Sequence, residues 1–411
     1  AQEVTGKNYL VVHSVKTTVL ALSVGIFLKE PQHRLLELAT AALLHELGMV
    51  RLPPNLYMAA RSLTPQEKKA ISTHPIIGYN ILKERTFSPN VALAVLDALV
   101  LTGRSSLTGL QALVNADPTT VTAAISTERM ISGLHEASIT VQGRKTAYLE
   151  RPGNGETIVL LHGFGADKDN WVRFVRHLPE EYRVIAFDLP GHGDSVRDEG
   201  KTYTIDYITA GFAEAADALG LNRFHLVGNS MGGWVGMLYT VRNPGRVTTL
   251  SLFDSAGVSS PDPSDLHRAL AQGQNILVPA SEESFLTLLD YAFSREPFIP
   301  WPVKPVLARR AVRDAPFRLK MWNDLNLDRK DVVPVLPDLN LPVLVLWGAD
   351  DRITHVSSVR VFEQYLPRPE TVIMEHCGHM PMTEKPEESA AHYLAFVDRH
   401  RLKALPGGSG Q

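Results

Sequence analysis

The feature that most constrains the fold of this sequence is an alternation of short apolar runs with amphipathic segments, which begins near residue 136. Each run has the length of one buried strand, and the segments between runs have helical spacing. This alternation predicts a mostly parallel sheet covered by helices on both faces, an α/β fold. The predicted strands are 138–141, 146–149, 157–161, 184–187, 224–227, 248–253, 343–346 and 371–374, of which the first two form a hairpin.

A second set of segments predicts the helices of this unit and an insertion. The helices are 170–177, 205–219, 231–242, 357–365 and 387–399. Between 261 and 331, helical pieces and a proline-rich stretch interrupt the alternation, which predicts a helical cap over the carboxyl end of the sheet. Some apolar cap residues are candidates to line a substrate pocket, although most suit an ordinary cap core: Phe285, Leu286, Leu289, Tyr291, Phe293, Phe298, Trp301 and Trp322.

The first part of the chain has a different pattern. Its apolar spacing is helical from about residue 9 to 100, and no good strand occurs before about 136. A length of 411 residues suits two or three domains. We therefore predict a helical domain at 1–115, a junction at 116–135 with an amphipathic helix near 121–134, and an α/β domain at 136–411.

Composition excludes several kinds of partner and site. The formal net charge of −3 gives no electrostatic reason to bind nucleic acid or an anionic membrane. The single cysteine, Cys377, excludes an intrachain disulfide and a multi-cysteine zinc site. No apolar run has the length of a membrane span, and no signal segment follows Ala1, so a cytoplasmic location is the default expectation, with the true start of the chain left open.

The chemistry-bearing motif is Gly228-Asn229-Ser230-Met231-Gly232, between a predicted strand and a predicted helix. A sharp strand-to-helix turn of this kind exposes a serine in strained backbone angles and needs small residues on either side. It also places the serine at a helix N-terminus, where the amide of Met231 is able to stabilise an oxyanion. The motif predicts Ser230 as a nucleophile.

A serine nucleophile needs a histidine base, and the histidine needs a carboxylate that fixes its tautomer. Asp350 and Asp351 directly follow the predicted strand 343–346, and His376 and His379 follow 371–374. Gly378 suits an exposed loop bend, which favours His379 as the base. Asp254, after the predicted strand 248–253, is a third position from which an acid is able to reach the histidine.

A second oxyanion donor is expected in the loop His162-Gly163-Phe164-Gly165, where glycine lets the backbone approach a substrate. The amide of Phe164 is the candidate. We expect the side chain of His162 to brace the loop rather than to contact substrate, and His192 to be a turn residue.

These motifs, in this order, resemble the α/β-hydrolase superfamily over about residues 136–405. Within it, the stretches 163–171, 228–234 and 377–386 are similar to bacterial family V lipases and esterases. The resemblance implies that the acid is Asp351, the fifth residue of Trp347-Gly348-Ala349-Asp350-Asp351. It also implies ester hydrolysis through an acyl-enzyme, with no metal or organic cofactor.

A different resemblance covers about residues 9–98. His13, His45-Glu46 and His74, with the segments around them, resemble the HD-GYP phosphodiesterases, which bind a metal pair. Glu46 replaces the aspartate of that family, Met49 replaces its lysine, and the later histidines and the Gly-Tyr-Pro segment are absent from this sequence. The pattern favours a degenerate helical module without a bound metal.

Two classes of function remain to be compared. The first is hydrolysis of a small-molecule or lipid ester, with carbon–carbon bond hydrolysis of dienoic acids as an enzymatic alternative. That alternative needs cations for the substrate carboxylate, and Arg309, Arg310 and Arg313 of the cap are the candidates. The second class is a signalling protein whose HD-like domain senses a nucleotide.

Overall fold

The computed structural model describes residues 128–297, 303–327 and 330–401, with residues 18, 22, 36, 39, 40, 42–44, 64, 81, 125 and 126. The chain divides into two compact units, Ala1–Thr127 and Glu128–Gln411. His13, His45, Glu46 and His74 lie outside the described residues, as does nearly all of the predicted helical domain.

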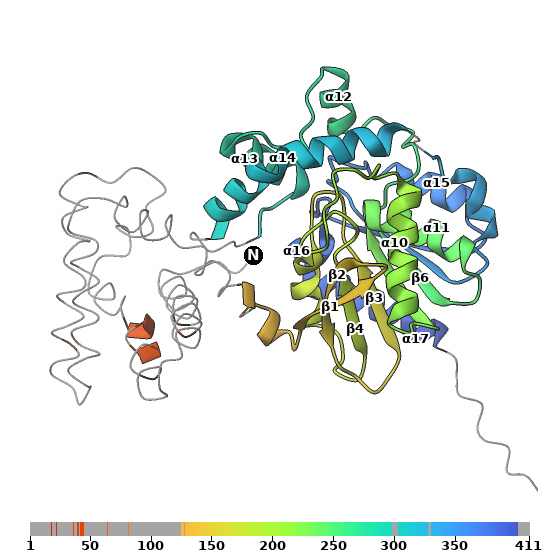
Figure 1. Cartoon of the computed structure of the whole chain (residues 1–411), viewed down its shortest axis with the longest axis horizontal. Coiled ribbons are helices and arrows are strands. Elements are labelled where there is room, and N and C mark those ends of the chain that lie inside the picture. The colour runs from red at the N-terminus through yellow and green to blue at the C-terminus, as the bar shows by residue number, and fades with distance from the viewer. Residues whose placement is uncertain are drawn as a thin grey trace, which may run out of the picture. The chain divides into compact units, whose positions relative to one another are not determined.

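An 8-stranded sheet forms the centre of the second unit (Figure 1). Its strands are β1 (His135–Val141), β2 (Arg144–Arg151), β3 (Thr157–Leu161), β4 (Arg183–Phe187), β5 (Phe224–Asn229), β6 (Val247–Phe253), β7 (Val343–Gly348) and β8 (Pro369–Met374). They lie in the order β1-β2-β4-β3-β5-β6-β7-β8. The β1–β2 hairpin is antiparallel to its neighbour β4, and all the other pairs are parallel. The predicted mostly parallel sheet is confirmed.

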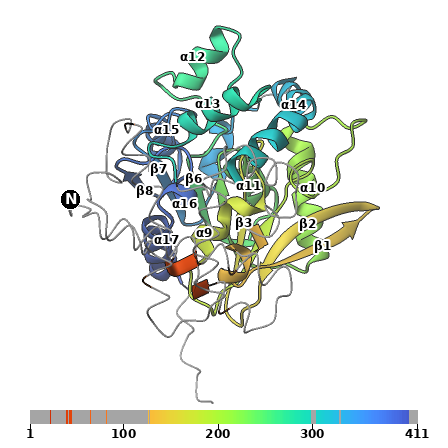
Figure 2. The ribbon, with the colours of Figure 1, turned by 90° about the vertical axis from the view of Figure 1, so that its left-hand side faces the viewer.

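Helices cover both faces of the sheet (Figure 2). One layer contains α10 (Ile205–Ala218), α11 (Met231–Arg242) and α15 (Ser358–Tyr365), and the other contains α9 (Val172–Val175) and α17 (Pro386–His400). Short helical turns η2 (Lys168–Trp171), η3 (Val333–Asp338) and α16 (Pro381–Glu384) complete the unit.

The apolar runs form this sheet because their alternate side chains enter opposite layers. Val159 and Leu161 of β3 pack with the α10–α11 layer, and Ile158 and Leu160 pack with the α9–α17 layer. All four side chains are 0% exposed. Each fully buried side chain of this size contributes about 1.5–3 kcal/mol, so a strand that is apolar on both faces suits only a doubly covered sheet.

Residues 128–134, which the sequence assigns to the predicted junction, pack on the sheet unit. Arg129 donates from Nε and Nη2 to the two carboxylate oxygens of Asp169, at 2.5 and 2.6 Å. The hydroxyl of Ser132 donates to the carbonyl of Val172 over 2.9 Å. Leu134 is buried in the α9–α17 layer, so this short segment is part of the second unit.

The predicted cap consists of α12 (Asp265–Ala271), α13 (Glu282–Ala292) and α14 (Val303–Leu327), which lie together at one end of the sheet (Figure 1). All three occur between β6 and β7 in the chain. The amide of Val332 donates to the carbonyl of Gly257 over 3.0 Å, so the two ends of the insertion meet. None of the described helices is both long and apolar enough to cross a bilayer.

Candidate active site

Ser230 lies at the turn between β5 and α11, as the sequence predicts. Its backbone angles are φ +53° and ψ −118°, a left-handed conformation that is strained for a residue with a side chain. The amide of Ser230 donates to the carbonyl of Phe253, and its carbonyl accepts from the amides of Gly233 and Ala256, all at 3.0 Å. The surrounding backbone therefore holds the strained turn in place.

The glycines on either side of Ser230 are required by close backbone contacts. A methyl group on Gly228 would lie 2.3 Å from the carbonyl oxygen of Gly232. One on Gly232 would lie 2.3 Å from the carbonyl oxygen of Leu161 at the end of β3. These contacts explain the two glycines of the motif and bring the serine beside the loop that follows β3, where Gly163 faces the Cβ of Ser230.

Two other predicted site residues come together in the structure. Nδ1 of His379, after β8, lies 3.0 Å from Oδ2 of Asp351, after β7. Both residues are buried, with 6% and 3% of their surface exposed. The main chain fixes the histidine as well, because its amide donates to Ala292 and its carbonyl accepts from Nδ2 of Asn229.

The neighbouring candidates Asp350 and His376 face outward. Asp350 is exposed and accepts a hydrogen bond from the hydroxyl of Ser294 at 2.6 Å, and His376 is also exposed. Gly378 is buried, so the prediction of an exposed loop bend beside His379 is wrong. A methyl group there would lie 2.7 Å from the carbonyl oxygen of Ala292, so glycine allows a close contact with the cap.

Thr354 is a site residue that the sequence analysis missed. Its hydroxyl lies 2.5 Å from Oδ2 of Asp351, 3.1 Å from the carbonyl oxygen of Asp254 and 3.2 Å from Nδ1 of His379. A hydroxyl residue three positions after the acid was the available signal. Burial opposes ionisation of Asp351, but His379, Thr354 and the amide of Ile353 outweigh it and lower the pKa of that carboxyl below its ordinary value.

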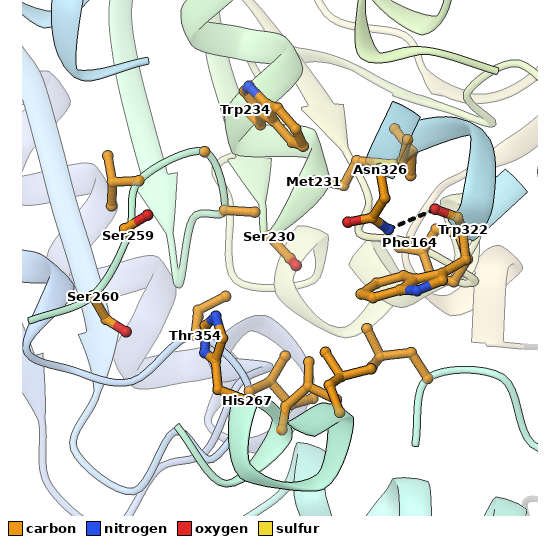
Figure 3. Close-up of a pocket in the computed structure, with 18 of the residues that line it drawn as sticks. Phe164, Ser230, Met231, Trp234, Ser259, Ser260, His267, Trp322, Asn326 and Thr354 are labelled. Atoms are coloured by element: carbon orange, nitrogen blue, oxygen red, sulfur yellow. Dashed lines mark hydrogen bonds between the residues drawn. The ribbon is translucent and has the colours of Figure 1, made fainter. Parts of the chain in front are cut away.

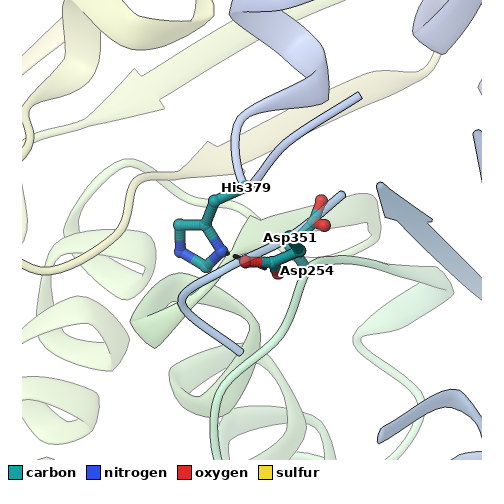
Figure 4. Close-up of side chains that lie close together, drawn as sticks. All are labelled: Asp254, Asp351 and His379. Atoms are coloured by element: carbon teal, nitrogen blue, oxygen red, sulfur yellow. Dashed lines mark hydrogen bonds and ion pairs between the residues drawn. The ribbon is translucent and has the colours of Figure 1, made fainter. Parts of the chain in front are cut away.

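Asp254, the third candidate acid, lies in the same cluster (Figure 4). It is completely buried, and its Oδ1 accepts from the amide of Gly348 over 2.8 Å. One carboxylate oxygen of Asp254, one of Asp351 and a ring nitrogen of His379 lie within 4.8 Å of one another. No hydrogen bond between Asp254 and His379 occurs in the part of the chain that the structure describes, so Asp351 is the carboxylate that contacts the imidazole.

The two candidate oxyanion donors lie beside Ser230. Phe164 and Met231 line the same cavity as the serine, and neither amide donates to any other described residue. The ring of Phe164 packs edge-on against Trp322 of α14, with centroids 5.7 Å apart. An amide that lacks an acceptor among the described residues, on a residue that lines a cavity, is available to a ligand.

A buried ion pair holds the loop that carries Phe164, and the sequence analysis did not identify it. Nζ of Lys168 lies 2.8 Å from Oδ2 of Asp188 and 2.6 Å from Oδ2 of Asp194. Burial by itself would lower the pKa of Lys168, but Asp188 and Asp194 outweigh it and raise the pKa above its ordinary value. His162 adds the predicted brace, since its Nε2 accepts from the amide of Leu189 over 3.0 Å.

A cavity of about 190 Å³ opens beside Ser230 (Figure 3). Most of its apolar lining comes from the elbow and the cap: Phe164, Met231, Trp234, Leu266, Leu270, Leu277, Trp322, Leu325 and Ile353. Its polar lining includes Ser230, Ser259, Ser260, His267, Asn326, Lys330, Asp331 and Thr354. Figure 3 shows the Ser230 hydroxyl pointing into this space.

Of the cap residues expected to line a pocket, Trp322 alone does so among those described. Phe285 packs instead with Ala308 and Ala311 between α13 and α14. Leu289, Tyr291 and Phe293 join a cluster with Leu266 and Ile353, and Leu286 is exposed. Phe298 and Trp301 lie outside the described residues.

The sequence of this unit matches a known protein family. The profile described as "Alpha/beta hydrolase family" matches residues 158–392, more than half of the chain. This chain belongs to the alpha/beta hydrolase family. The elbow, the buried His379–Asp351 pair and the cap all lie within the matched residues.

Among relatives of this hydrolase, Lipase 1 of Psychrobacter immobilis is 33% identical over 278 residues, which cover 66% of this chain and 87% of the lipase. A solved structure of a bacterial membrane phospholipase A is 42% identical with a TM-score of 0.68, covering 75% of this chain and 98% of that one. A meta-cleavage product hydrolase from Pseudomonas fluorescens IP01 shares the fold at 23% identity and a TM-score of 0.55, covering 64% and 97%.

The beginning of the chain matches a second family. The profile described as "HD domain" covers residues 6–99, in agreement with the predicted HD-like segment. The residues that would bind metal in such a domain lie outside the described part of the chain. Two statements stay predictions: that the HD domain is degenerate and binds no metal, and that the hydrolase site needs no cofactor.

Proposed function

We propose that this chain cleaves carboxylic esters through an acyl-enzyme formed on Ser230. That it is an ester hydrolase follows from its family and from the lipases among its relatives. The observation that carries the finer proposal is the buried pair of His379 and Asp351 at the end of the sheet where the strained Ser230 lines a cavity. In the proposed roles, Ser230 is the nucleophile, His379 the base and Asp351 the acid that orients it.

In the proposed reaction, His379 carries out each proton transfer. The Ser230 hydroxyl attacks the ester carbonyl carbon and gives its proton to Nε2 of His379, while Asp351 holds Nδ1. The same histidine then protonates the departing alcohol and activates the water that releases the acid. The amides of Phe164 and Met231 donate to the oxyanion in both tetrahedral intermediates, each typically worth about 3 kcal/mol of transition-state stabilisation.

The cavity supports an apolar acyl group as the part of the substrate that is buried. A cavity of about 150 Å³ holds a benzene molecule, so one of about 190 Å³ has room for roughly seven carbon atoms. Longer acyl chains would extend beyond it. The relatives named as lipases and as a phospholipase A support a small-molecule or lipid ester as the substrate.

The alternative of carbon–carbon bond hydrolysis receives less support from the cap. The arginines considered for a dienoate carboxylate do not line the cavity. Arg313 is paired with Asp314 at 3.1 Å, Arg310 lies 3.9 Å from Asp194, and Arg309 also has a partner.

A nucleotide-sensing role for the HD domain rests on the match at 6–99 alone and would be tested by titrating the chain with cyclic dinucleotides.

The test is substitution of the nucleophile and base with p-nitrophenyl esters of short to long acyl chains as substrates. Ser230→Ala should lower kcat by about 10⁴-fold or more while the circular dichroism spectrum is kept. Ser281→Ala, at the exposed start of α13, is the matched control and should leave kcat unchanged. His379→Ala should be as damaging as Ser230→Ala, and His376→Ala mild. More than a tenth of wild-type activity in Ser230→Ala would contradict the proposal.

A further inference from the structure

Asp254 is a buried carboxyl group for which the proposed reaction has no use. It directly follows β6 in a left-handed conformation, with φ +46°. Its amide donates to the carbonyl of Leu346, and Oδ1 accepts from the amide of Gly348, so the residue joins the ends of β6 and β7. The hydroxyl of Thr354, which donates to Asp351, lies 3.1 Å from its carbonyl oxygen. Three groups, from Leu346, Gly348 and Thr354, are therefore arranged around this one residue.

The hydrogen bonds of Asp254 and Asp351 are very unequal. Asp351 accepts from the amides of Ile353 and Thr354, from the Thr354 hydroxyl and from Nδ1 of His379. Asp254 accepts from one amide, and its Oδ2 is buried without a donor among the described residues. A buried carboxylate needs several donors or a cation to remain ionised. Only Asp351 has them.

Two ionised carboxylates at this separation would also oppose each other. A carboxylate oxygen of Asp254 lies within 4.8 Å of one of Asp351, and Asp254 is completely buried from solvent. The titratable groups facing Asp254 are Asp351 after β7, His379 and Cys377 after β8, and Glu384 of α16. None of them is a cation unless His379 is protonated. Burial, and then the charge of Asp351, raise the pKa of Asp254 well above its ordinary value.

We propose that Asp254 is a positioning residue that stays protonated at neutral pH. Its Oδ2–H donates a hydrogen bond to the carboxylate of Asp351. The proposal rests on the roles of Asp351 and His379 given above. A neutral Asp254 leaves one negative charge beside the imidazole, which balances the positive charge that His379 acquires during the reaction. Two negative charges there would favour the protonated imidazole and remove the base.

Three substitutions distinguish a neutral donor from a second ionised acid. Asn in place of Asp254 keeps both contacts, because its carbonyl accepts from Gly348 and its amide donates to Asp351. Asp254→Asn should therefore keep kcat/KM for p-nitrophenyl esters within about threefold of wild type, with the acidic limb of the pH profile at the same pH. Asp254→Ala should lower kcat about tenfold with little change in KM. Asp350→Asn, at the exposed neighbour of Asp351, is the control for removal of a nearby charge.

Loss of activity in Asp254→Asn as large as in Asp254→Ala, or an acidic limb displaced to lower pH, would overturn the proposal. A direct measurement covers the case in which Asp254→Ala does not fold. The infrared difference between wild type and Asp254→Asn at neutral pH should contain the carbonyl stretch of a protonated carboxylic acid. A difference that contains only carboxylate bands would show Asp254 ionised. This readout does not depend on turnover, so it separates failure of this proposal from failure of the proposed triad.

Discussion

Nδ1 of His379 and Oδ2 of Asp351 lie 3.0 Å apart in a contact that buries both side chains. The two residues are 28 positions apart in the sequence. They meet because they follow β7 and β8, which are parallel neighbours in the sheet. Asp350 precedes Asp351 directly, yet its side chain faces solvent and Ser294. Adjacent aspartates therefore provide a matched pair for testing which carboxylate acts on the histidine.

Asp351→Asn should lower kcat by about 10⁴-fold, because an amide would favour the wrong tautomer of His379 and could not stabilise the imidazolium. Asp350→Asn should leave kcat within about threefold, because it loses only an exposed hydrogen bond. Steady-state kinetics with one p-nitrophenyl ester compares the two variants. The reverse order of damage would assign the acid to Asp350.

Lys168→Met should destabilise the hydrolase unit by about 3–5 kcal/mol, because it leaves Asp188 buried without its cation. Arg268→Met removes an exposed helical ion pair with Asp265 and should cost less than about 1 kcal/mol. All five tryptophans of the chain lie in the second unit, so their fluorescence during urea unfolding follows that unit alone. Equal midpoints for the two variants would show that the buried pair adds no more than a surface pair.

The stability of the hydrolase unit should depend on the proton of Asp254. Its pKa is raised in the folded protein, whereas the unfolded chain has the ordinary value of about 4. Between these two values the folded state binds more protons, so stability falls as pH rises, by up to about 1.4 kcal/mol per pH unit. Asp254→Asn removes this slope. Urea unfolding at pH 5, 6 and 7 should show the variant gaining stability relative to wild type, and a constant difference would contradict a protonated Asp254.

Removal of the first unit should leave ester hydrolysis intact, since every proposed catalytic group lies between Phe164 and His379. A chain that starts near residue 120 keeps the helical segment whose end packs on the sheet through Arg129 and Ser132. It should fold, by circular dichroism, and keep kcat/KM within about tenfold of the full chain. A larger loss in a folded truncated chain, more than roughly 1.4 kcal/mol of transition-state stabilisation, would show that the HD domain contributes to the site.

In the chain of 411 residues, chelators should not change ester hydrolysis, since none of the residues proposed to act requires a metal. The measurement is kcat/KM before and after treatment with EDTA. Loss of activity that added divalent metal restores would contradict the expectation.

The sequence was sufficient to predict those parts of the molecule that local pattern determines. Apolar runs with both faces buried predict strands, and the glycines around Ser230 predict the turn because the backbone there leaves no space for a side chain. It was not sufficient for the contacts that depend on tertiary packing. Lys168 reads as a surface lysine until Asp188 and Asp194 are brought around it, and Thr354 reads as a loop residue until β7 and β8 place His379 beside it.

The cap shows the same limit. Its helices were predictable from their spacing, but which of their apolar side chains face the cavity depends on how the helices pack. Phe285 and Trp322 are both large aromatic residues of predicted cap helices. Phe285 packs between α13 and α14, whereas Trp322 lines the cavity.

The hydrogen bond from Val332 to Gly257 makes the cap an exchangeable part. Because the insertion leaves and re-enters the hydrolase unit at one point, its length can change without altering the register of β6 and β7. The proposed nucleophile, base, acid and oxyanion loop all lie outside the insertion, whereas α12 and α14 supply much of the cavity wall. Substrate preference in this enzyme can therefore diverge, or be transplanted from a relative, by replacing one continuous segment of chain.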